Sequence, residues 1–288
     1  MRIIFTGFIS FLISCCSVVA QAQLIVAHRG ASHDAPENTM AAFRLAWKKQ
    51  ADAIEGDFYM TRDRQIVCIH DKTTKRVAPK QRELKVAEST FHELRTLDVG
   101  SWKDPRYAAE RIPVLAEVLA TVPDGKQIFV EIKCGPEILP LLKRQLEVSG
   151  LKPEQIVIIC FNKAVVTRSS RMMPQYNANW LTGYKQKTEG SEWKPTRDDV
   201  LETLIHTGAT GLGANGNLKV INRRYVDTIQ AAGSSFHVWT VNDAEPARTF
   251  MSLGVDSITT DRPAFIRNAL RLENHTRQQH EESIQVPR

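Results

Sequence analysis

The sequence predicts an α/β protein that folds as a (β/α)8 TIM barrel. Eight short runs rich in Ile and Val alternate along the 288 residues with stretches whose apolar residues recur at three- and four-residue spacing. Strands that alternate with helices indicate a parallel sheet, and eight such units indicate a closed sheet with its active site where the strands end. One catalytic barrel domain is expected at residues 23–272, followed by a polar tail at 273–288.

The strands and helices follow from this alternation. The expected strands are residues 24–28, 53–58, 128–133, 156–161, 180–183, 211–214, 236–241 and 255–259. The first helix is expected to begin after Asn38, which is placed at its N-cap. Later helices are expected at residues 136–149, 163–173, 197–207, 222–232, 243–252 and 263–272.

A β-hairpin interrupts the alternation after the second expected strand. The polar turn 61–65 leads directly into a new apolar run at 66–70, and a turn this short cannot make a parallel crossover. With the turn centred between Asp63 and Arg64, His70 is expected opposite Asp57. The hairpin is therefore predicted to bring a histidine beside carboxylates.

Residues 72–111 are predicted to form a small inserted lobe. This segment is polar, contains no strand–helix unit of its own and is too long for an ordinary barrel loop. Thr90 and Glu93 match a capping box, in which the two side chains satisfy the first N–H groups of a helix, so one short helix is expected here. The residues from Arg111 onward are expected to return the chain to the barrel.

The first 22 residues differ in composition from the rest and indicate a signal peptide. Arg2 is the only charge, an apolar stretch follows, and residues 20–22 (Ala-Gln-Ala) have the small residues of a cleavage site. Export to the periplasm or the medium is expected, with no membrane span after cleavage; an uncleaved transmembrane anchor is the alternative. Residues 12–15 (Leu-Ile-Ser-Cys) leave open a lipoprotein anchored at Cys15.

Composition narrows the classes of partner. The formal net charge is +6 and 42% of the residues are hydrophobic, as in ordinary soluble globular proteins. No block of Lys and Arg is interleaved with aromatic residues, so nucleic-acid binding is not expected. The positive charge suits an anionic substrate or an acidic surface, but it is equally common in exported proteins that bind neither. A small-molecule substrate is expected, and the oligomeric state is left open.

Three cysteines follow the expected signal peptide, namely Cys68, Cys134 and Cys160. Each lies in or beside an apolar run, and three cysteines do not make a disulfide framework, so buried thiols are expected. A bridge between Cys134 and Cys160 is left open for an oxidising compartment, because both are expected near the ends of consecutive strands.

Reactive side chains gather where the expected strands end. Because side chains alternate along a strand, residues two apart share a face. Seven residues are thereby expected at one rim of the barrel: His28, Arg29, Glu55, Asp57, His70, Glu131 and Lys133. Each alone is common in proteins, but so many like charges in one mouth are costly unless a cation compensates them.

The side-chain types at this rim indicate phosphoryl transfer. Three carboxylates without a thiolate favour one divalent cation with oxygen ligands, Mg²⁺ or Ca²⁺, over zinc. Two histidines outside the metal shell suit a general acid and a general base. Arg29 has the planar donor geometry that matches a phosphate oxygen. Cation, arginine and paired histidines together can stabilise a phosphoryl-transfer transition state.

The same residues, with further motifs, resemble the glycerophosphodiester phosphodiesterase family. The matching motifs are His28-Arg29-Gly30, residues 35–39 (Ala-Pro-Glu-Asn-Thr), Glu55-x-Asp57, His70-Asp71, Glu131-Ile132-Lys133, residues 239–242 (Trp-Thr-Val-Asn) and residues 260–263 (Thr-Asp-Arg-Pro). The likeness spans residues 24 to 270 and extends through the expected lobe.

The resemblance implies a barrel enzyme, similar to phospholipase C, that hydrolyses sn-glycerol 3-phosphodiesters to an alcohol and glycerol 3-phosphate. The family mechanism uses the substrate's own glycerol hydroxyl as nucleophile, and it leaves open which histidine is the acid. The implied roles are metal ligands for Glu55, Asp57 and Glu131, acid and base for His28 and His70, and phosphate binding for Arg29 with Lys133 nearby.

Three aromatic residues, Trp239, Phe161 and Trp102, are candidates for the wall of the pocket. A core role explains Trp239 equally well, and residues such as Phe161 and Trp102 more often serve packing alone. The match to the family is loose at residues 72–76, directly after His70-Asp71. This departure leaves open which leaving alcohol is preferred.

Two other functions compete with this interpretation. A phosphodiesterase of the lysophospholipase D or sphingomyelinase D kind would use the same barrel and metal site, but no long apolar loop that could face a membrane is visible. A binding protein that had lost the reaction would be expected to lack at least one of the acidic or histidine residues of the rim, and all five are present.

Overall fold

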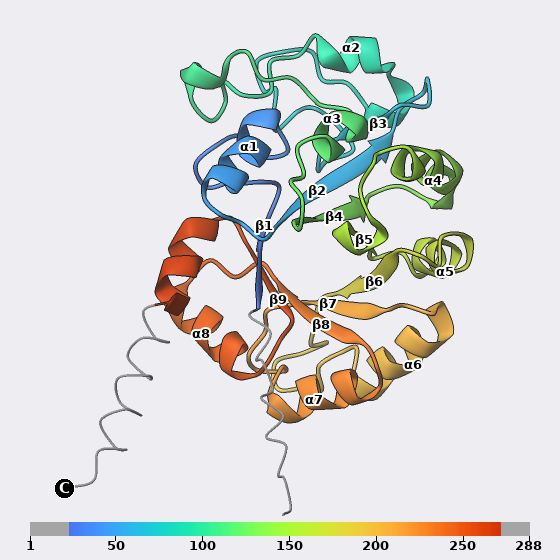
Figure 1. Ribbon diagram of the computed structural model, residues 1–288, viewed down its shortest axis with the longest axis vertical. Coiled ribbons are helices and arrows are strands. Elements are labelled where there is room, and N and C mark those ends of the chain that lie inside the picture. The colour runs from blue at the N-terminus through green and yellow to red at the C-terminus, as the bar shows by residue number, and fades with distance from the viewer. Residues whose placement is uncertain (1–22, 272–288) are drawn as a thin grey trace, which may run out of the picture.

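A closed barrel of eight parallel strands forms the centre of the protein, and helices surround it (Figure 1). The computed structural model describes residues 23–271. The order around the barrel is β1-β9-β8-β7-β6-β5-β4-β2, and β1 pairs with β2 to close it. The strands are β1 (Leu24–Ala27), β2 (Ala53–Met60), β4 (Gln127–Ile132), β5 (Ile156–Cys160), β6 (Asn177–Thr182), β7 (Gly211–Asn215), β8 (Ser235–Trp239) and β9 (Ser257–Thr260). The predicted fold class is confirmed.

Helices connect consecutive parallel strands across the outside of the barrel. They are α1 (Met40–Lys48), α3 (Leu115–Leu119), α4 (Leu139–Glu147), α5 (Lys163–Met172), α6 (Arg197–Thr207), α7 (Arg223–Ala231) and α8 (Ala244–Ser252), with one more at residues 263–271. Short 3-10 turns, η3 (Pro136–Ile138) and η4 (Pro153–Gln155), flank α4. Within residues 23–271, no helix is long and apolar enough to cross a membrane.

The prediction that Asn38 caps the first helix is wrong. Thr39 holds the N-cap of α1, and its Oγ1 accepts a hydrogen bond of 3.3 Å from the N–H of Ala42. Asn38 adopts a left-handed backbone conformation with φ of 56°, which its short amide side chain tolerates. The side chain of Asn38 is thereby free to reach the barrel rim.

Two apolar layers stabilise the barrel. The outer layer lies between the strands and the helices. The inner layer fills the barrel with Val26, Ala53, Phe129, Val157, Ile159 and Leu181. Phe129 and Glu131 share the inward face of β4, and Glu55 on β2 pairs in register with Phe129. The carboxylates of the rim therefore lie directly above an apolar floor.

The predicted hairpin is present, but its register differs by one residue. Strand β3 (Ile66–Cys68) runs antiparallel to β2, and the N–H of Ile69, not of His70, bonds the carbonyl of Asp57 at 2.9 Å. The turn is closed by the N–H of Thr61 on the carbonyl of Gln65, with Arg64 left-handed at φ of 60°. A three-residue loop with its last residue left-handed shifts the centre of the turn by half a residue relative to a two-residue loop.

The chain between β3 and α3 forms a lobe at one end of the barrel (Figure 1). It contains η1 (Val86–Glu88), α2 (Phe91–Arg95) and η2 (Pro105–Tyr107), and the predicted capping box of Thr90 and Glu93 is confirmed. An apolar cluster that includes Val77, Leu84 and Leu94 holds the lobe together, and Tyr59 and Val67 of the β2–β3 hairpin join it.

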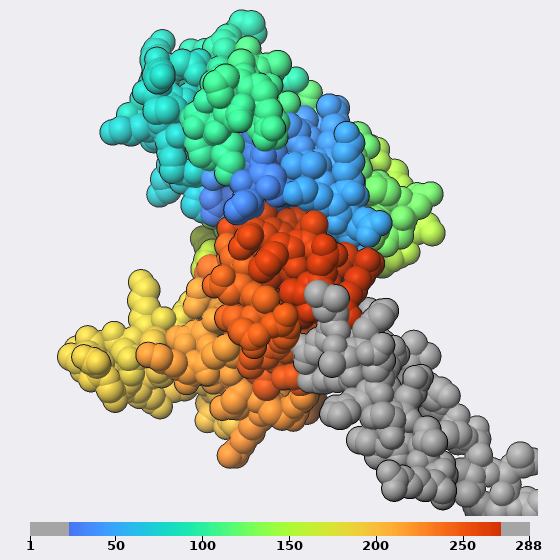
Figure 2. Space-filling model, turned by 90° about the vertical axis from the view of Figure 1, so that its left-hand side faces the viewer, coloured from blue at the N-terminus to red at the C-terminus, as the bar shows by residue number. Residues whose placement is uncertain are grey.

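The lobe and the segment between β6 and α6 project to the same side of the molecule. Figure 2 shows the lobe in cyan to green and the second segment in yellow, with a hollow between them. The connection after β6 leaves the carboxyl end of that strand, so this side is the one where the barrel strands end.

All three cysteines of the described residues are free thiols, so the bridge left open between Cys134 and Cys160 is absent. The Sγ of Cys160 instead donates to the carbonyl of Ile132 at 3.0 Å. Burial raises the pKa of the Cys160 thiol to about 12, which keeps it protonated.

One titratable side chain, His237 on β8, lies inside the barrel below the rim. Its Nδ1 and Nε2 form hydrogen bonds of 2.7 and 2.8 Å with the hydroxyls of Ser257 and Ser235. Its ring meets the ring of Phe129 edge-on, with centroids 5.6 Å apart. Burial lowers the pKa of His237 to about 4, so the imidazole is neutral near pH 7.

We predict that His237 makes the protein less stable below its ordinary pKa of 6.5. Between pH 6.5 and about 4 the unfolded state binds a proton that the folded state excludes, so the free energy of unfolding falls as the pH falls. The loss from pH 7 to pH 5 should be about 1–2 kcal/mol larger in the native protein than in His237→Gln. Urea unfolding of both proteins at both pH values measures this difference, and equal pH dependence would contradict it.

Candidate active site

A sharp turn after β1 brings the first functional residues to the rim. Arg29 and Gly30 are both left-handed, with φ of 55° and 79°. A Cβ at Gly30 would lie 2.5 Å from the backbone carbon of Ala42 in α1, so only glycine fits. The turn aims the backbone N–H of Arg29 at Oε2 of Glu55, 2.9 Å away. Packing against α1 thus determines where the His28-Arg29 pair lies.

The three predicted carboxylates lie together at the rim and are buried. Glu55, Asp57 and Glu131 are 2%, 1% and 8% exposed, and one oxygen of each lies within 4.8 Å of the others. Strand β2 supplies two of them because alternate residues share its inward face, and the register of β4 sets Glu131 beside Asp57.

Two cations lie among these carboxylates. Nζ of Lys133 is 2.6 Å from Oε1 of Glu131 and 3.3 Å from Oδ1 of Asp57. Nε of Arg29 is 3.2 Å from Oδ2 of Asp57. Burial acts to raise the pKa of Asp57, but the charges of Lys133 and Arg29 outweigh it and hold this pKa below its ordinary value. Two cations against three carboxylates leave one negative charge without a partner.

Glu55 is the carboxylate that lacks a charged partner. Its Oε1 is buried and accepts no hydrogen bond from any described residue. Burial, reinforced by the charge of Asp57, raises the pKa of Glu55 to about 8. A buried carboxylate oxygen without a donor, next to two more carboxylates, is a site that fits a divalent cation.

The donor atoms favour a hard cation. All three possible ligands are carboxylate oxygens, which suit Mg²⁺ or Ca²⁺. The nearest thiol, Cys68, donates from Sγ to Oδ1 of Asn38 at 3.1 Å. Burial raises the pKa of Cys68 well above its ordinary value, so no thiolate is offered.

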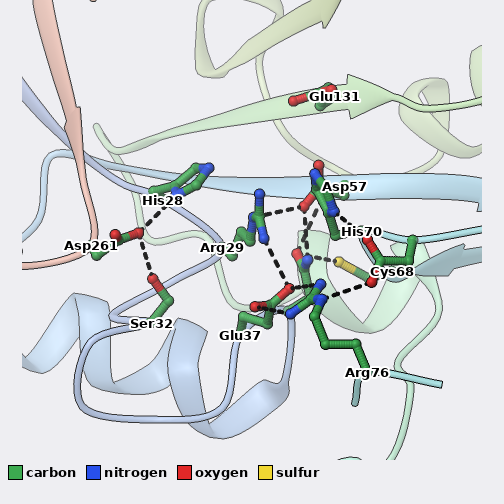
Figure 3. Close-up of polar contacts among 12 residues, drawn as sticks. His28, Arg29, Ser32, Glu37, Asp57, Cys68, His70, Arg76, Glu131 and Asp261 are labelled. Atoms are coloured by element: carbon green, nitrogen blue, oxygen red, sulfur yellow. Dashed lines mark hydrogen bonds and ion pairs between the residues drawn. The ribbon is translucent and has the colours of Figure 1, made fainter. Parts of the chain in front are cut away.

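Both predicted histidines lie at the mouth, each held by a carboxylate. Nδ1 of His28 is 2.7 Å from Oδ1 of Asp261, and Nδ1 of His70 is 2.7 Å from Oδ1 of Asp71. Figure 3 shows the two rings on opposite sides of Arg29. With Nδ1 engaged in both rings, Nε2 is the nitrogen left for proton transfer.

The surroundings move the pKa values of the two histidines in opposite directions. Burial acts to lower the pKa of His28, but the hydrogen bond to Asp261 and the charge of Glu55 outweigh it and raise this pKa. For His70, burial outweighs the attraction of Asp57 and lowers the pKa. Two titratable groups whose environments separate their pKa values are typical of an acid–base pair.

The sequence did not reveal the residues that orient His28. Asp261 accepts hydrogen bonds from the Ser32 hydroxyl (2.9 Å) and from Nδ2 of Asn242 (2.6 Å) as well as contacting His28. Asp261 belongs to the Thr-Asp-Arg-Pro motif, but a contact across 233 positions in the chain gives no local pattern. Asn242 lies in the loop after β8, and Asp243 rather than Asn242 holds the N-cap of α8.

Asn38, which was expected to cap the first helix, and its neighbour Glu37 support the charged cluster. Asn38 donates from Nδ2 to Oδ2 of Asp57 at 2.8 Å, and its Oδ1 accepts the backbone N–H of Asp57 at 3.2 Å. Glu37 accepts from Arg29 at 3.0 Å and from Arg76 at 2.7 Å. Asn38 therefore fixes the Asp57 carboxylate, and Glu37 fixes the guanidinium that faces it.

A cavity of about 150 Å³ opens among these residues and continues into the barrel. Trp239 and Phe161 line it, with ring centroids 5.5 Å apart, as expected for a pocket wall. Trp102, the third candidate, does not line it. The indole N–H of Trp102 donates to the carbonyl of Val99, and the ammonium of Lys103 lies over its ring, so Trp102 serves the lobe instead.

Comparison with known proteins identifies the family. A profile of the Glycerophosphoryl diester phosphodiesterase family matches residues 28–265. The chain belongs to this family. The resemblance and the enzyme class predicted from the sequence, a glycerophosphodiester phosphodiesterase, are thereby confirmed.

Relatives match over nearly their whole length. A Bacillus subtilis (strain 168) protein whose name places it among the glycerophosphodiester phosphodiesterases is 33% identical over 248 residues, which is 84% of this chain and 96% of the relative. A glycerophosphodiester phosphodiesterase of Caldanaerobacter subterraneus subsp. tengcongensis is 29% identical over 261 residues, 86% of this chain and 98% of the relative.

Solved structures share the fold. An Oleispira antarctica phosphodiesterase, solved in complex with the product sn-glycerol-3-phosphate, matches with a TM-score of 0.76 and 24% identity. The match covers 87% of this chain and 97% of the other. The two proteins therefore share the barrel fold.

We predict that Asp261→Asn lowers the pKa of His28. The hydrogen bond and charge of Asp261 oppose the effect of burial, and an amide supplies no negative charge to stabilise the imidazolium. His28 in the native protein should therefore keep its proton to a higher pH than in the variant. NMR titration of the imidazole Cε1–H signal measures both values, with Asp227→Asn on the exposed face of α7 as control. An unchanged pKa in Asp261→Asn would remove Asp261 from this role.

Proposed function

We propose that the protein hydrolyses glycerophosphodiesters to an alcohol and sn-glycerol 3-phosphate, with one bound divalent cation, Mg²⁺ or Ca²⁺. The observation that carries this proposal is the buried carboxylate triad, in which Oε1 of Glu55 has no hydrogen-bond partner. Family membership supports the substrate class. The solved relative from Oleispira antarctica holds sn-glycerol-3-phosphate as its product on the same fold.

Glu55, Asp57 and Glu131 would hold the cation, which when bound supplies positive charge for the phosphate and for the attacking oxygen. Arg29 and Lys133, already at the triad, are the cations of this chain that can bind phosphate oxygens as negative charge develops on them. A bound cation would also keep Glu55 ionised, because positive charge lowers the pKa of a carboxyl group.

His28 and His70 would move the protons. One histidine accepts the proton of the attacking glycerol hydroxyl as its oxygen bonds to phosphorus. The other donates a proton to the alcohol oxygen as the bond from that oxygen to phosphorus breaks. The attack leaves a cyclic phosphodiester, in which phosphorus bridges two oxygens of the glycerol. Water then attacks the phosphorus of this cyclic diester, with the roles of the two histidines reversed. This step gives glycerol 3-phosphate and returns both histidines to their starting protonation states. Asp261 and Asp71 hold the rings in orientation throughout.

Export is a further part of the proposal. It is supported by the composition of residues 1–22, which lie outside the described residues, as does the expected tail at 273–288. The competing lysophospholipase D-like activity is tested by including a lysophospholipid among the assayed substrates.

Removal of the cation should abolish turnover. Dialysis of the mature protein against excess chelator should stop hydrolysis of glycerophosphocholine, and addition of Mg²⁺ or Ca²⁺ should restore it, because the triad would otherwise repel the phosphate. Glu55→Gln should raise the cation concentration needed for half-maximal activity. Full activity in excess chelator would contradict the proposal that Glu55, Asp57 and Glu131 bind a catalytic cation.

Loss of either rim histidine should slow the chemical step. His28→Ala and His70→Ala should each lower kcat by roughly two to four orders of magnitude, as expected for the loss of a general acid or base. His92→Ala, an exposed histidine of α2, is the matched control and should retain native kcat. Circular dichroism checks that each variant folds. Native turnover in a folded His28 or His70 variant would exclude that residue from proton transfer.

A further inference from the structure

A second cavity adjoins the catalytic pocket where the barrel meets the lobe. Its volume is about 990 Å³, against about 150 Å³ for the catalytic pocket. Glu131, Lys133 and Phe161 line both cavities, so the two are contiguous. We call the larger one the lobe groove; its walls are the β2–β3 turn, the start of the lobe and the loops after β4 and β5.

The lobe groove is rich in positive charge. Besides Lys133, its basic lining residues are Arg62, Arg64, Lys72 and Lys85, and its acidic lining residues are Glu88, Glu131 and Glu137. All three acids are already engaged: Glu88 by Lys85 at 3.0 Å, Glu131 by Lys133, and Glu137 by the backbone N–H of Gly135 at 3.0 Å. The positive charge of the groove therefore exceeds what its own carboxylates neutralise.

Two of these cations have no partner among the described residues. Arg62 contacts Glu93 at 3.5 Å and Lys85 contacts Glu88, whereas Arg64 and Lys72 form no ion pair or side-chain hydrogen bond within residues 23–271. Residues 72–111 contain ten basic and six acidic residues, so the lobe supplies four of the six net positive charges of the chain. Free positive charge is thus concentrated on the lobe side of the site.

Hydrogen bonds anchor the two backbone segments that carry Arg64 and Lys72. The N–H of Arg62 bonds the carbonyl of Ser89 at 3.0 Å, and Oδ1 of Asp63 accepts the N–H of Phe91 at 3.0 Å, which fastens the β2–β3 turn to the lobe. The carbonyl of Lys72 accepts the N–H of Val86 at 3.0 Å. Arg64 and Lys72 therefore extend from anchored segments.

We propose that the lobe groove binds the leaving alcohol and favours an alcohol that carries negative charge, such as a second phosphate group. The inference rests on the proposed function. A phosphodiester held at Lys133 has two ester arms, and the smaller pocket has room for a glycerol unit while the groove has room for a larger alcohol. Lys72 follows His70 by two positions and lines the same groove as Lys133.

Electrostatics determines the direction of the preference. Free cations at a site attract an anionic group and repel a cationic one such as choline. Both side chains are exposed, so solvent and salt screen them and each contributes a modest factor. We therefore expect kcat/KM to increase gradually from cationic through neutral to anionic leaving alcohols. The change should lie in KM rather than in kcat, because Arg64 and Lys72 are not placed among the groups that react.

Three substrates that share the sn-glycerol 3-phosphate half test this proposal. Their leaving alcohols are choline (cationic), glycerol (neutral) and glycerol phosphate (anionic). The variants are Arg64→Gln, Lys72→Gln and the double variant. Lys80→Gln is the matched control, since Lys80 is an exposed lysine of the lobe that does not line the groove.

The native enzyme should have its highest kcat/KM for the anionic substrate. The double variant should lower kcat/KM for that substrate about tenfold, mainly through KM, and change it less than about twofold for the neutral one. Added salt should narrow the native preference, because it screens exposed charges. Lys80→Gln should match the native enzyme for all three substrates.

The possible failures are distinguishable. No hydrolysis of any of the three substrates overturns the proposed function, and this inference with it. Hydrolysis of all three with equal kcat/KM in the native and double-variant enzymes overturns the groove proposal alone. An equal loss for all three substrates in the double variant, or the same loss in Lys80→Gln, also overturns it, because the effect would not depend on the groove.

Discussion

The burial of three carboxylates at one rim is the constraint on which the rest of the site depends. Like charges this close, with almost no exposure to water, are unfavourable unless positive charge accompanies them. Arg29 and Lys133 supply two such charges, and each has its own ion pairs to hold it there. Glu55 is the carboxylate left without a positive partner, and its pKa rises to about 8. The left-handed turn at Arg29 and the register between β2 and β4 both serve to assemble this charge balance.

The histidines belong to the same electrostatic unit, because their pKa values respond to it in opposite directions. His28 is drawn toward its charged form by Asp261 and Glu55, while His70 is held neutral mainly by burial. The hydrogen bond to Asp261 is the largest cause that raises the pKa of His28, and Asp261 is itself oriented by Asn242. For one histidine to be protonated and the other neutral at the same pH, supporting residues such as Asp261 are needed as well as the two rings.

The site residues that lie on or directly after strands could be predicted from the alternation of side chains along each strand. Alternation along β2 and β4 was enough to place Glu55, Asp57, Glu131 and Lys133 on inward faces, because side-chain direction in a strand is a local property. The hairpin register was missed by one residue, since it depends on the left-handed conformation of Arg64, a non-glycine residue that carries no such expectation. The contact of His28 with Asp261 joins the ends of neighbouring strands β1 and β9, but the two residues are 233 positions apart in the sequence, so the contact leaves no local pattern.

Under our proposal, the barrel carries out the reaction and the lobe recognises the leaving alcohol. The eight strands hold the charged cluster, and the chemistry of that cluster depends on burial inside the barrel. The lobe projects beyond the barrel and packs through its own apolar cluster onto the β2–β3 hairpin. Of its surface residues, Arg76 reaches the rim, where it bonds Glu37. The β2–β3 hairpin links the two, because β2 carries Asp57 and the turn is hydrogen-bonded to the lobe. The backbone from which Arg64 and Lys72 extend is therefore anchored to the lobe and to the strand that carries Asp57. This limits how far the two exposed charges can move from the reacting centre, and such preorganisation favours discrimination between alcohols.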